Sequence, residues 1–427
     1  KDIENMSVLN FIIKEIFGQG AIFLALVAMV GLILQKKKPS EIVRGTLMTA
    51  IGFFVLNTGT GLITGKSIDG IIATFNTLMP GNAAAPASVD IGAEYGTQIG
   101  VVMLIGFAFN ILVARFTKWK SVFLTGHMLY WFPFVFIAAG VDAGLTGGKL
   151  IGFAAVFTGL YMVIAPNLMR PLVKAVTGKD DFTIAHPTTT LSVIAGFVAG
   201  LVGDKSKSCE DLKLPESLGF LREVSITGSI SIALVYLILF GIVCSQGLVP
   251  AEVFGYTGSF FTYLFTHSVY FGVGVTVMLQ GVRMLIAEIV PAFKGIAEKL
   301  VPGAIPALDC PVLFGYGPNS LLIGFIVAVI TSTATILLTR GMFPTVIIPL
   351  IFTCFFENGC AAIIANAKGG IRGTIIASAL NGVIMVLLVG FGAYFFNKTI
   401  QPWMLVYGGQ DFSLFGIVEG IIARLIP

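Results

Sequence analysis

Long apolar runs are the feature of this sequence that most restricts its fold. Residues 21–34, 101–113, 230–244 and 374–396 hold no charged side chain. With their flanks these runs reach the roughly 20 residues that a helix needs to cross a bilayer, and they lack the two-residue alternation of membrane barrels. The chain is 56% hydrophobic and 11% charged, whereas soluble domains hold roughly 25% charged residues. We therefore predict an all-α polytopic membrane protein.

The apolar runs fall into two similar sets, and together they predict about 10 to 11 transmembrane helices plus re-entrant hairpins and amphipathic helices. The first set is expected near 18–35, 42–63, 97–116, 121–140 and 149–169, followed by a short re-entrant piece at 189–203. The second set is expected near 226–247, 262–282, 319–339, 343–364 and 371–396, with a last segment from Phe412.

Basic residues occur in short clusters between these runs, around Lys36, Arg115 and Arg170. All three clusters fall on one side of the membrane, which the positive-inside rule makes cytoplasmic, with the N-terminus outside. Charge in this pattern reflects membrane topology, so we expect contact with the lipid bilayer and none with nucleic acid.

A weak internal echo supports two repeats. Leu78, Pro80, Gly81 and Tyr95 recur in order as Leu300, Pro302, Gly303 and Tyr316. We predict a first repeat at 1–205, a cytoplasmic linker at 206–221 and a second repeat at 222–427. With an odd number of spans in each repeat the copies would be inverted, which places a substrate site where interrupted helices meet near the midplane.

Charged residues gather at 280–319 within this apolar chain. A charge in hydrocarbon costs at least ~2.5 kcal/mol, so such residues face protein, water or a ligand. Arg283, Glu288, Lys294 and Glu298 have the spacing of an amphipathic helix at the membrane interface. Asp309 lies between prolines that forbid a regular helix, so we expect its carboxylate to line a cavity and to accept hydroxyl groups.

His127 is a further candidate, and two aromatic candidates follow it. Tyr130 and Trp131 follow it within about one helical turn. A neutral imidazole donates and accepts hydrogen bonds, as sugar hydroxyls require, and aromatic faces suit apolar ring surfaces. The alternative is a core histidine bonded to a neighbouring carbonyl group.

His186, Pro187 and Thr188 precede an apolar helix. Proline suits a first helical position, and free N–H groups at such a helix start attract anionic or oxygen-rich ligands. The alternative is a helix cap that binds nothing.

Glu357 and Asn358 interrupt another apolar run. Glu357 is either a proton site of a coupled carrier or a neutral hydrogen-bonding partner. The sequence holds no nucleotide-binding loop, no HExxH pair and no GxSxG turn. We expect no cofactor, no metal and no catalytic residue in this chain.

Several short polar strings resemble one known family. These strings are Leu124-Thr125-Gly126-His127, residues 210–215, residues 280–284, and residues 301–304 leading to Asp309. They are similar to the ascorbate-specific permease (enzyme IIC) of the bacterial phosphotransferase system. The resemblance implies a homodimer in the inner membrane, with inverted repeats that both contribute to a scaffold domain and to a mobile core that moves as an elevator. It also implies that L-ascorbate is delivered inward to partner enzyme IIB, whose phosphocysteine phosphorylates it during uptake, with enzyme IIA as a further partner.

The same resemblance suggests the substrate-binding residues. It assigns His127, His186 and Asp309, together with a pair near Pro86 and Ala87. Two glutamines of the family are replaced here, by Trp131 and Pro187. Galactitol or another polyol therefore stays open as the substrate, as does an ion-coupled carrier that uses Asp309 or Glu357.

Overall fold

The computed structural model describes residues 19–78, 88–212, 223–339, 341–345 and 347–426, together with 11, 15, 16 and 220. Within these residues, seven helices are long and apolar enough to cross a membrane. The predicted class, a mostly helical polytopic membrane protein, is thereby confirmed. The expected count of 10 to 11 spans stays a prediction.

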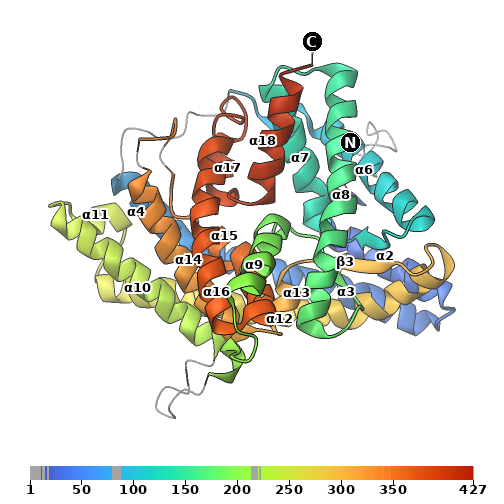
Figure 1. Ribbon diagram of the computed structural model, residues 1–427, viewed down its shortest axis with the longest axis horizontal. Coiled ribbons are helices and arrows are strands. Elements are labelled where there is room, and N and C mark those ends of the chain that lie inside the picture. The colour runs from blue at the N-terminus through green and yellow to red at the C-terminus, as the bar shows by residue number, and fades with distance from the viewer. Residues whose placement is uncertain are drawn as a thin grey trace.

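The described residues form the following helices and strands (Figure 1). The first half contains α2 (Gly20–Leu34), α3 (Pro39–Ile63), η2 (Thr64–Ile68), α4 (Asp69–Leu78), α5 (Ile91–Glu94), α6 (Gly96–Phe116), β1 (Ser121–Phe123), α7 (Gly126–Asp142), α8 (Gly147–Thr177), β2 (Thr183–Ile184), α9 (Thr189–Val202) and η3 (Cys209–Asp211). The second half contains α10 (Val224–Ser245), α11 (Pro250–Phe254), α12 (Phe260–Lys299), β3 (Ile305–Leu308), α13 (Pro311–Phe314), α14 (Pro318–Leu338), α15 (Ile351–Phe355), α16 (Glu357–Gly392), α17 (Gln401–Tyr407) and α18 (Asp411–Ala423).

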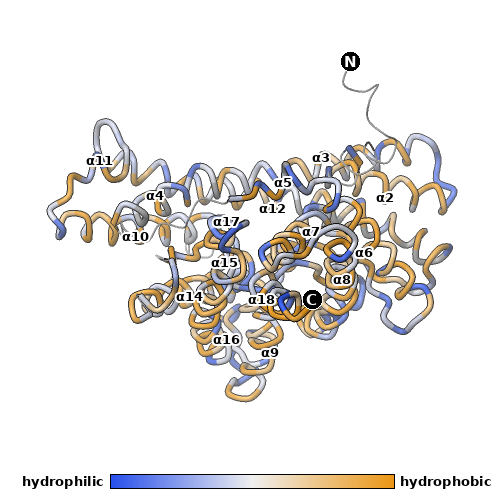
Figure 2. Tube along the Cα trace, turned by 90° about the horizontal axis from the view of Figure 1, so that it is seen from above, coloured by the Kyte–Doolittle hydropathy of each residue, from blue (hydrophilic) through white to orange (hydrophobic). Residues whose placement is uncertain are grey.

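The helices pack in two groups. In the first group α12 lies along α3 and also contacts α2 and α10. In the second group α16 packs on α14 and α9, and α8 packs on α6 and α7. Figure 2 shows the first group as a long band on one side of the molecule, with the second group beside it and apolar residues over much of both. Each group draws helices from both halves of the sequence.

Glycines bring α3 and α12 into close contact. A Cβ atom on Gly281 would overlap the backbone nitrogen of Leu56, and one on Gly59 would overlap the backbone of Met278. Small residues of this kind let two membrane helices approach until their backbones touch. The contact fixes α3, whose other face reaches the cavity described below.

The charged end of α12 does not form a separate segment. One helix runs continuously from Phe260 to Lys299, with Pro291 inside it. Glu288 pairs with Arg44 of α3 at 3.0 Å, and Arg283 is exposed. The residues that we expected in an interfacial arm therefore extend a spanning helix.

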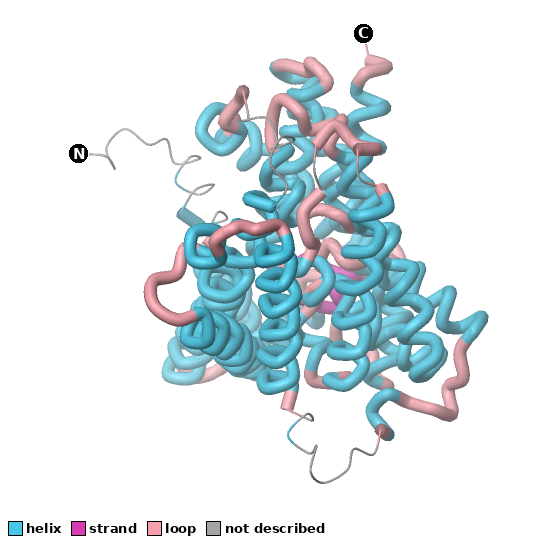
Figure 3. The backbone as a smooth tube through the Cα atoms, turned by 90° about the vertical axis from the view of Figure 1, so that its left-hand side faces the viewer, coloured by secondary structure: helices cyan, strands magenta, loops and turns pink. Residues whose placement is uncertain are grey.

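Three short strands, which the apolar pattern did not indicate, lie inside the helical body (Figure 3). The strand β3 pairs in parallel with β1 on one side and β2 on the other, so that Ala307 lies opposite both Phe123 and Thr183. The segment expected as a span at 121–140 thus begins as a strand. The helix that follows it, α7, has 17 residues.

The hydrogen-bond gap that Pro166 leaves in α8 is filled by a side chain from α6. Pro166 has no N–H group, so the carbonyl of Met162 one turn earlier lacks its helical donor. The amide of Asn110 donates to that carbonyl oxygen at 2.9 Å and to the carbonyl of Ser121 at 3.1 Å. Its oxygen accepts from the N–H of Phe123 at 2.9 Å. One buried amide therefore joins α6, α8 and β1.

A glycine pair breaks α16. Gly370 has a φ of 58°, which favours glycine, and the helix changes direction there. The freed carbonyl of Gly369 accepts from the N–H of Asp204, and the N–H of Ile371 donates to Lys207. The loop after α9 thus covers the break, which falls where the sequence predicted the boundary between two spans.

Candidate functional site

The candidate site lies at one edge of the small sheet. Asp309 directly follows β3, His186 follows β2 by two residues, and His127 follows β1 within the first turn of α7. Because the carboxyl ends of parallel strands meet at the same edge, the sheet brings these three side chains together. Backbone bonds extend the pairing toward them, from Leu124 to Ala307 and from Ala185 to Leu308.

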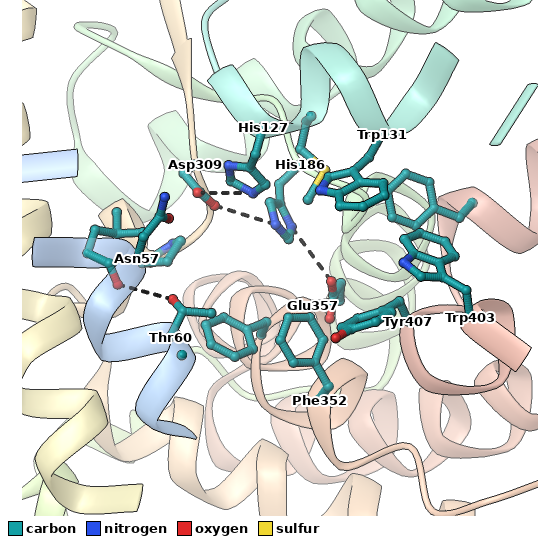
Figure 4. A pocket seen from close by; sticks show the side chains of 16 residues that line it. Asn57, Thr60, His127, Trp131, His186, Asp309, Phe352, Glu357, Trp403 and Tyr407 are labelled. Atoms are coloured by element: carbon teal, nitrogen blue, oxygen red, sulfur yellow. Dashed lines mark hydrogen bonds and ion pairs between the residues drawn. The ribbon is translucent and has the colours of Figure 1, made fainter. Parts of the chain in front are cut away.

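The carboxylate of Asp309 faces both imidazoles (Figure 4). Its Oδ2 is 3.6 Å from Nε2 of His127, and its Oδ1 is 3.5 Å from Nε2 of His186. On the other side of the second ring, Nδ1 of His186 is 3.8 Å from Oε1 of Glu357. Each separation exceeds an ordinary hydrogen bond, so the four groups approach one another without saturating their bonding capacity.

These groups are buried and partly unpaired. The side chains of Asp309, His186 and Glu357 are 9%, 4% and 1% exposed, whereas that of His127 is 28% exposed. Among the described residues, the Nδ1 atoms of both histidines, Oδ1 of Asp309 and Oε2 of Glu357 find no hydrogen-bond partner. Leaving such a buried group unsatisfied costs about 1–3 kcal/mol, so a ligand that offers hydroxyl groups would be stabilised here.

Burial also sets the protonation of one histidine. His186 lies between β2 and α9, outside the seven candidate spans. Burial lowers the pKa of His186 to about 4, a shift that the charge of Asp309 opposes and His127 reinforces. The ring is therefore neutral near pH 7 and offers both a donor and an acceptor.

A cavity of about 470 Å³ opens beside these groups. Its size falls in the range of roughly 300–1,000 Å³ that is usual for small-molecule sites. The walls are polar on one side and aromatic on the other. The lining residues are Leu56, Asn57, Thr60, Gly61, His127, Met128, Trp131, His186, Asp309, Pro311, Phe352, Phe356, Glu357, Trp403, Tyr407 and Phe412.

Two indole rings form the centre of the aromatic wall. The ring centroids of Trp131 and Trp403 are 5.3 Å apart with an interplanar angle of 31°. Trp403 also contacts Tyr407, at 5.1 Å, and Phe412, at 5.4 Å. Figure 4 shows Trp131 and Trp403 side by side, across the cavity from Asn57. Such faces suit the apolar side of a ring that presents its hydroxyls to the opposite wall.

Sequence reasoning missed the contribution of α3. Asn57 and Thr60 come from this helix and face the histidines across the cavity (Figure 4). A signal was available, because residues 57–61 interrupt an apolar helix with polar and small side chains. For Trp403 the sequence offers no comparable signal.

Other predicted site residues lie outside this lining. The ring of Tyr130 packs on Phe134 instead, with centroids 6.1 Å apart. The amide of Asn358 donates to the carbonyl of Gly324 at 3.0 Å within the helix bundle. Pro86 and Ala87 fall outside the described residues, so their predicted role stays a prediction.

The segment at the start of α9 bonds to protein groups. The N–H groups of Thr189 and Thr190 donate to Asp411 of α18, at 3.0 and 2.7 Å. The hydroxyl of Thr188 donates to the backbone carbonyl of Glu357 at 2.7 Å, and the carbonyl of Pro187 accepts from the N–H of Asp411. The helix start that we expected to offer free donors to a ligand is therefore capped from within the chain.

The same cluster has the composition of a metal site. The ligand atoms of His127, His186 and Asp309 all lie within 4.8 Å of one another. Imidazole and carboxylate are ligands that zinc and related cations accept. A divalent cation and a hydroxylated substrate would use the same atoms, so binding experiments need a chelator control.

The apolar helices define a multi-pass membrane protein, and the cavity with its buried polar groups is its candidate site for a small polar molecule. Residues 15–409 match the family described as the sugar-specific permease component of the phosphotransferase system, and the chain belongs to this family. It is 25% identical to the ascorbate-specific phosphotransferase EIIC component of Mycoplasma pneumoniae, over 93% of this chain and 68% of that protein. The resemblance found in the polar strings is thereby confirmed.

Proposed function

We propose that this permease binds L-ascorbate in the cavity beside Asp309 and carries it inward across the bacterial inner membrane. Enzyme IIB, itself phosphorylated by enzyme IIA, would then transfer a phosphoryl group from its cysteine sulfur to a hydroxyl oxygen of the substrate. The observation that supports the proposal most strongly is the set of unpaired buried atoms on His127, His186, Asp309 and Glu357. The ascorbate-specific relative supports the choice of substrate.

Both walls of the cavity suit such a molecule. The lactone ring of ascorbate is flat enough to lie against Trp131 and Trp403, and its hydroxyls would face the imidazoles and Asp309. Trp131 offers a ring for stacking where the family has a glutamine amide, and Pro187 removes a second amide. The site would therefore bind its ligand with fewer amide hydrogen bonds and more ring stacking. Pro187, Thr188, Tyr130 and Asn358 would support the site from behind its lining.

The two helix groups support transport by an elevator-type movement. The group of α2, α3, α10 and α12 would serve as the scaffold of a homodimer, and the group with the sheet would move as the core. Asn57 and Thr60 come from α3 of the proposed scaffold, whereas the histidines and Asp309 come from the segments that the sheet joins. Movement of the core would therefore carry the substrate away from α3, and His127, His186 and Asp309 would move together with the substrate.

Transport assays with labelled ascorbate test this function. We expect vesicles that contain the permease to accumulate phosphorylated ascorbate only when phosphoenolpyruvate and the soluble phosphotransferase enzymes are supplied. Uptake of unmodified ascorbate that needs an ion gradient would contradict the proposal and favour a coupled carrier. Accumulation of galactitol phosphate in place of ascorbate phosphate would change the substrate and keep the mechanism. A chelator is expected to leave ascorbate binding to the purified permease unchanged, and loss of that binding would place a metal among the binding groups.

A further inference from the structure

Asp411 makes an unusual set of contacts for a residue that does not line the cavity. It begins α18, is fully buried, and lies against the segment that holds His186. Its Oδ2 accepts from the N–H of Thr189 at 3.0 Å, and its Oδ1 accepts from the N–H of Thr190 at 2.7 Å. Its own N–H donates to the carbonyl oxygen of Pro187 at 3.4 Å.

A tyrosine from a third helix completes the arrangement. The hydroxyl of Tyr161, on α8, donates to Oδ2 of Asp411 at 2.6 Å and lies 3.2 Å from the carbonyl oxygen of His186. The N–H of Thr188 also donates to that carbonyl oxygen. The backbone from His186 to Thr190 is therefore held by partners from α8 and α18.

A carboxylate suits this position better than any neutral side chain. A helix start leaves backbone N–H groups without helical partners, and its dipole favours a negative charge. Two oxygens can accept from two consecutive N–H groups and from a hydroxyl at the same time. A carboxamide has one oxygen, so at least one of these buried donors would lose its partner.

We propose that Asp411 is a positioning residue for the substrate site, acting through the backbone of residues 186–190 to hold the imidazole of His186 against Asp309. The proposal rests on the proposed function, because it takes the cavity as the ascorbate site. The next residue, Phe412, lines the cavity and contacts Trp403. The start of α18 therefore positions both the imidazole of His186 and the ring of Phe412 in the aromatic wall. Binding geometry has to hold within about 0.5 Å, so a small shift of this turn weakens binding.

The chain offers a matched control for the capping chemistry. Glu210 accepts from the N–H groups of Asn319 and Ser320, at 3.1 and 2.9 Å, at the start of α14. It caps a helix across the chain just as Asp411 does, yet neither Glu210 nor these partners line the cavity. Glu210→Gln therefore reports what the loss of such a cap does by itself.

Hydrogen exchange on the ligand-free, full-length protein in nanodiscs tests the positioning directly. We expect Asp411→Asn to raise amide exchange at least tenfold in the peptide that contains residues 186–192, with little change elsewhere. Glu210→Gln is expected to raise exchange around residues 319–322 instead. Unchanged exchange at 186–192 in Asp411→Asn would overturn the proposal. Should that variant fail to fold, Tyr161→Phe, which removes only the hydroxyl, is expected to give a smaller rise in the same peptide.

Calorimetric binding of L-ascorbate separates positioning from simple stability. We expect Asp411→Asn to weaken binding at least tenfold and Glu210→Gln less than twofold, even when both lower the melting temperature equally. In a His186→Gln background Asp411→Asn should add less than threefold, because the group that it positions has been replaced. Equal losses in both backgrounds, or in both cap variants, would contradict the proposal. Absence of ascorbate binding to the unmodified protein would overturn the proposed substrate alone and leave the exchange experiment to decide the positioning.

Discussion

Oδ2 of Asp309 lies 3.6 Å from Nε2 of His127, although the two residues belong to different halves of the sequence. We expect Asp309→Asn and His127→Ala each to abolish ascorbate binding while the protein still folds, since both side chains face a cavity and support no helix. Calorimetry on purified variants would measure affinity, and thermal melting would report folding. Asp180→Asn removes an ion pair with Arg170 away from the cavity and should bind normally. Normal affinity in either site variant would place the site elsewhere.

Glu357 tests whether the carrier is coupled to protons. Its side chain is 1% exposed and adjoins His186, with Oε2 unpaired among the described residues. As a neutral hydrogen-bonding partner it should tolerate Glu357→Gln, with uptake changed less than threefold. Glu357→Leu removes the polar atoms and should reduce uptake at least tenfold. Loss of uptake in the glutamine variant, with ascorbate binding intact, would instead indicate a proton-carrying role.

Substitution of Trp403 tests how much the aromatic wall contributes to ascorbate binding. Stacking between aromatic rings and a flat ligand contributes roughly 0.5–1.5 kcal/mol beyond area burial. Together with lost burial, Trp403→Leu should weaken ascorbate binding by about tenfold, which corresponds to about 1.4 kcal/mol. Trp119→Leu is the matched control, because Trp119 is 37% exposed and absent from the cavity lining. Equal affinities for the Trp403 variant and the unmodified protein would show that the substrate does not contact this ring.

The substitution Asn110→Leu tests the side-chain bonds that join α6, α8 and β1. Asn110→Leu would leave the carbonyl of Met162 and the N–H of Phe123 without their partner. Each unsatisfied buried group costs about 1–3 kcal/mol, so a clearly lowered melting temperature is expected. The exposed Asn397 offers a control in Asn397→Ala. Comparable melting of both variants would mean that the Asn110 contacts contribute little.

Gly281 tests the contact between α3 and α12. Gly281→Ala adds a methyl group where the backbone of Leu56 already lies, and overpacking of this kind costs about 1–3 kcal/mol. Gly241→Ala in α10 adds the same group where no atom lies within 4 Å, and should be neutral. Thermal melting in nanodiscs compares the two variants. Similar melting temperatures would show that the helices separate without cost.

The helical class of this protein could be predicted because it depends on local composition. Apolar runs such as 101–113 and 230–244 became α6 and α10, since a bilayer accepts few other backbones. The sheet could not be predicted, because strands as short as Thr183–Ile184 have no periodicity to detect. Their parallel pairing joins distant parts of the chain, which no local pattern records.

Local composition also made part of the candidate site predictable. His127, His186 and Asp309 stood out as polar residues in apolar surroundings, and the structure gathers them around one cavity. At the start of α9 the sequence left a ligand site and a helix cap as alternatives, and the capping residue, Asp411, comes from the far end of the sequence. Trp403 was missed because an aromatic residue near the end of an apolar segment is ordinary in membrane proteins.

The pairing of β1, β2 and β3 has a mechanical consequence. Interstrand bonds connect the three loops that bear the imidazoles and the carboxylate. One loop cannot shift alone without breaking those bonds. As long as the sheet stays intact, the backbone at the base of these side chains keeps its spacing. The sheet therefore ties the three segments together at one edge, and Asp411 and Tyr161 fix the turn that continues from β2 to His186.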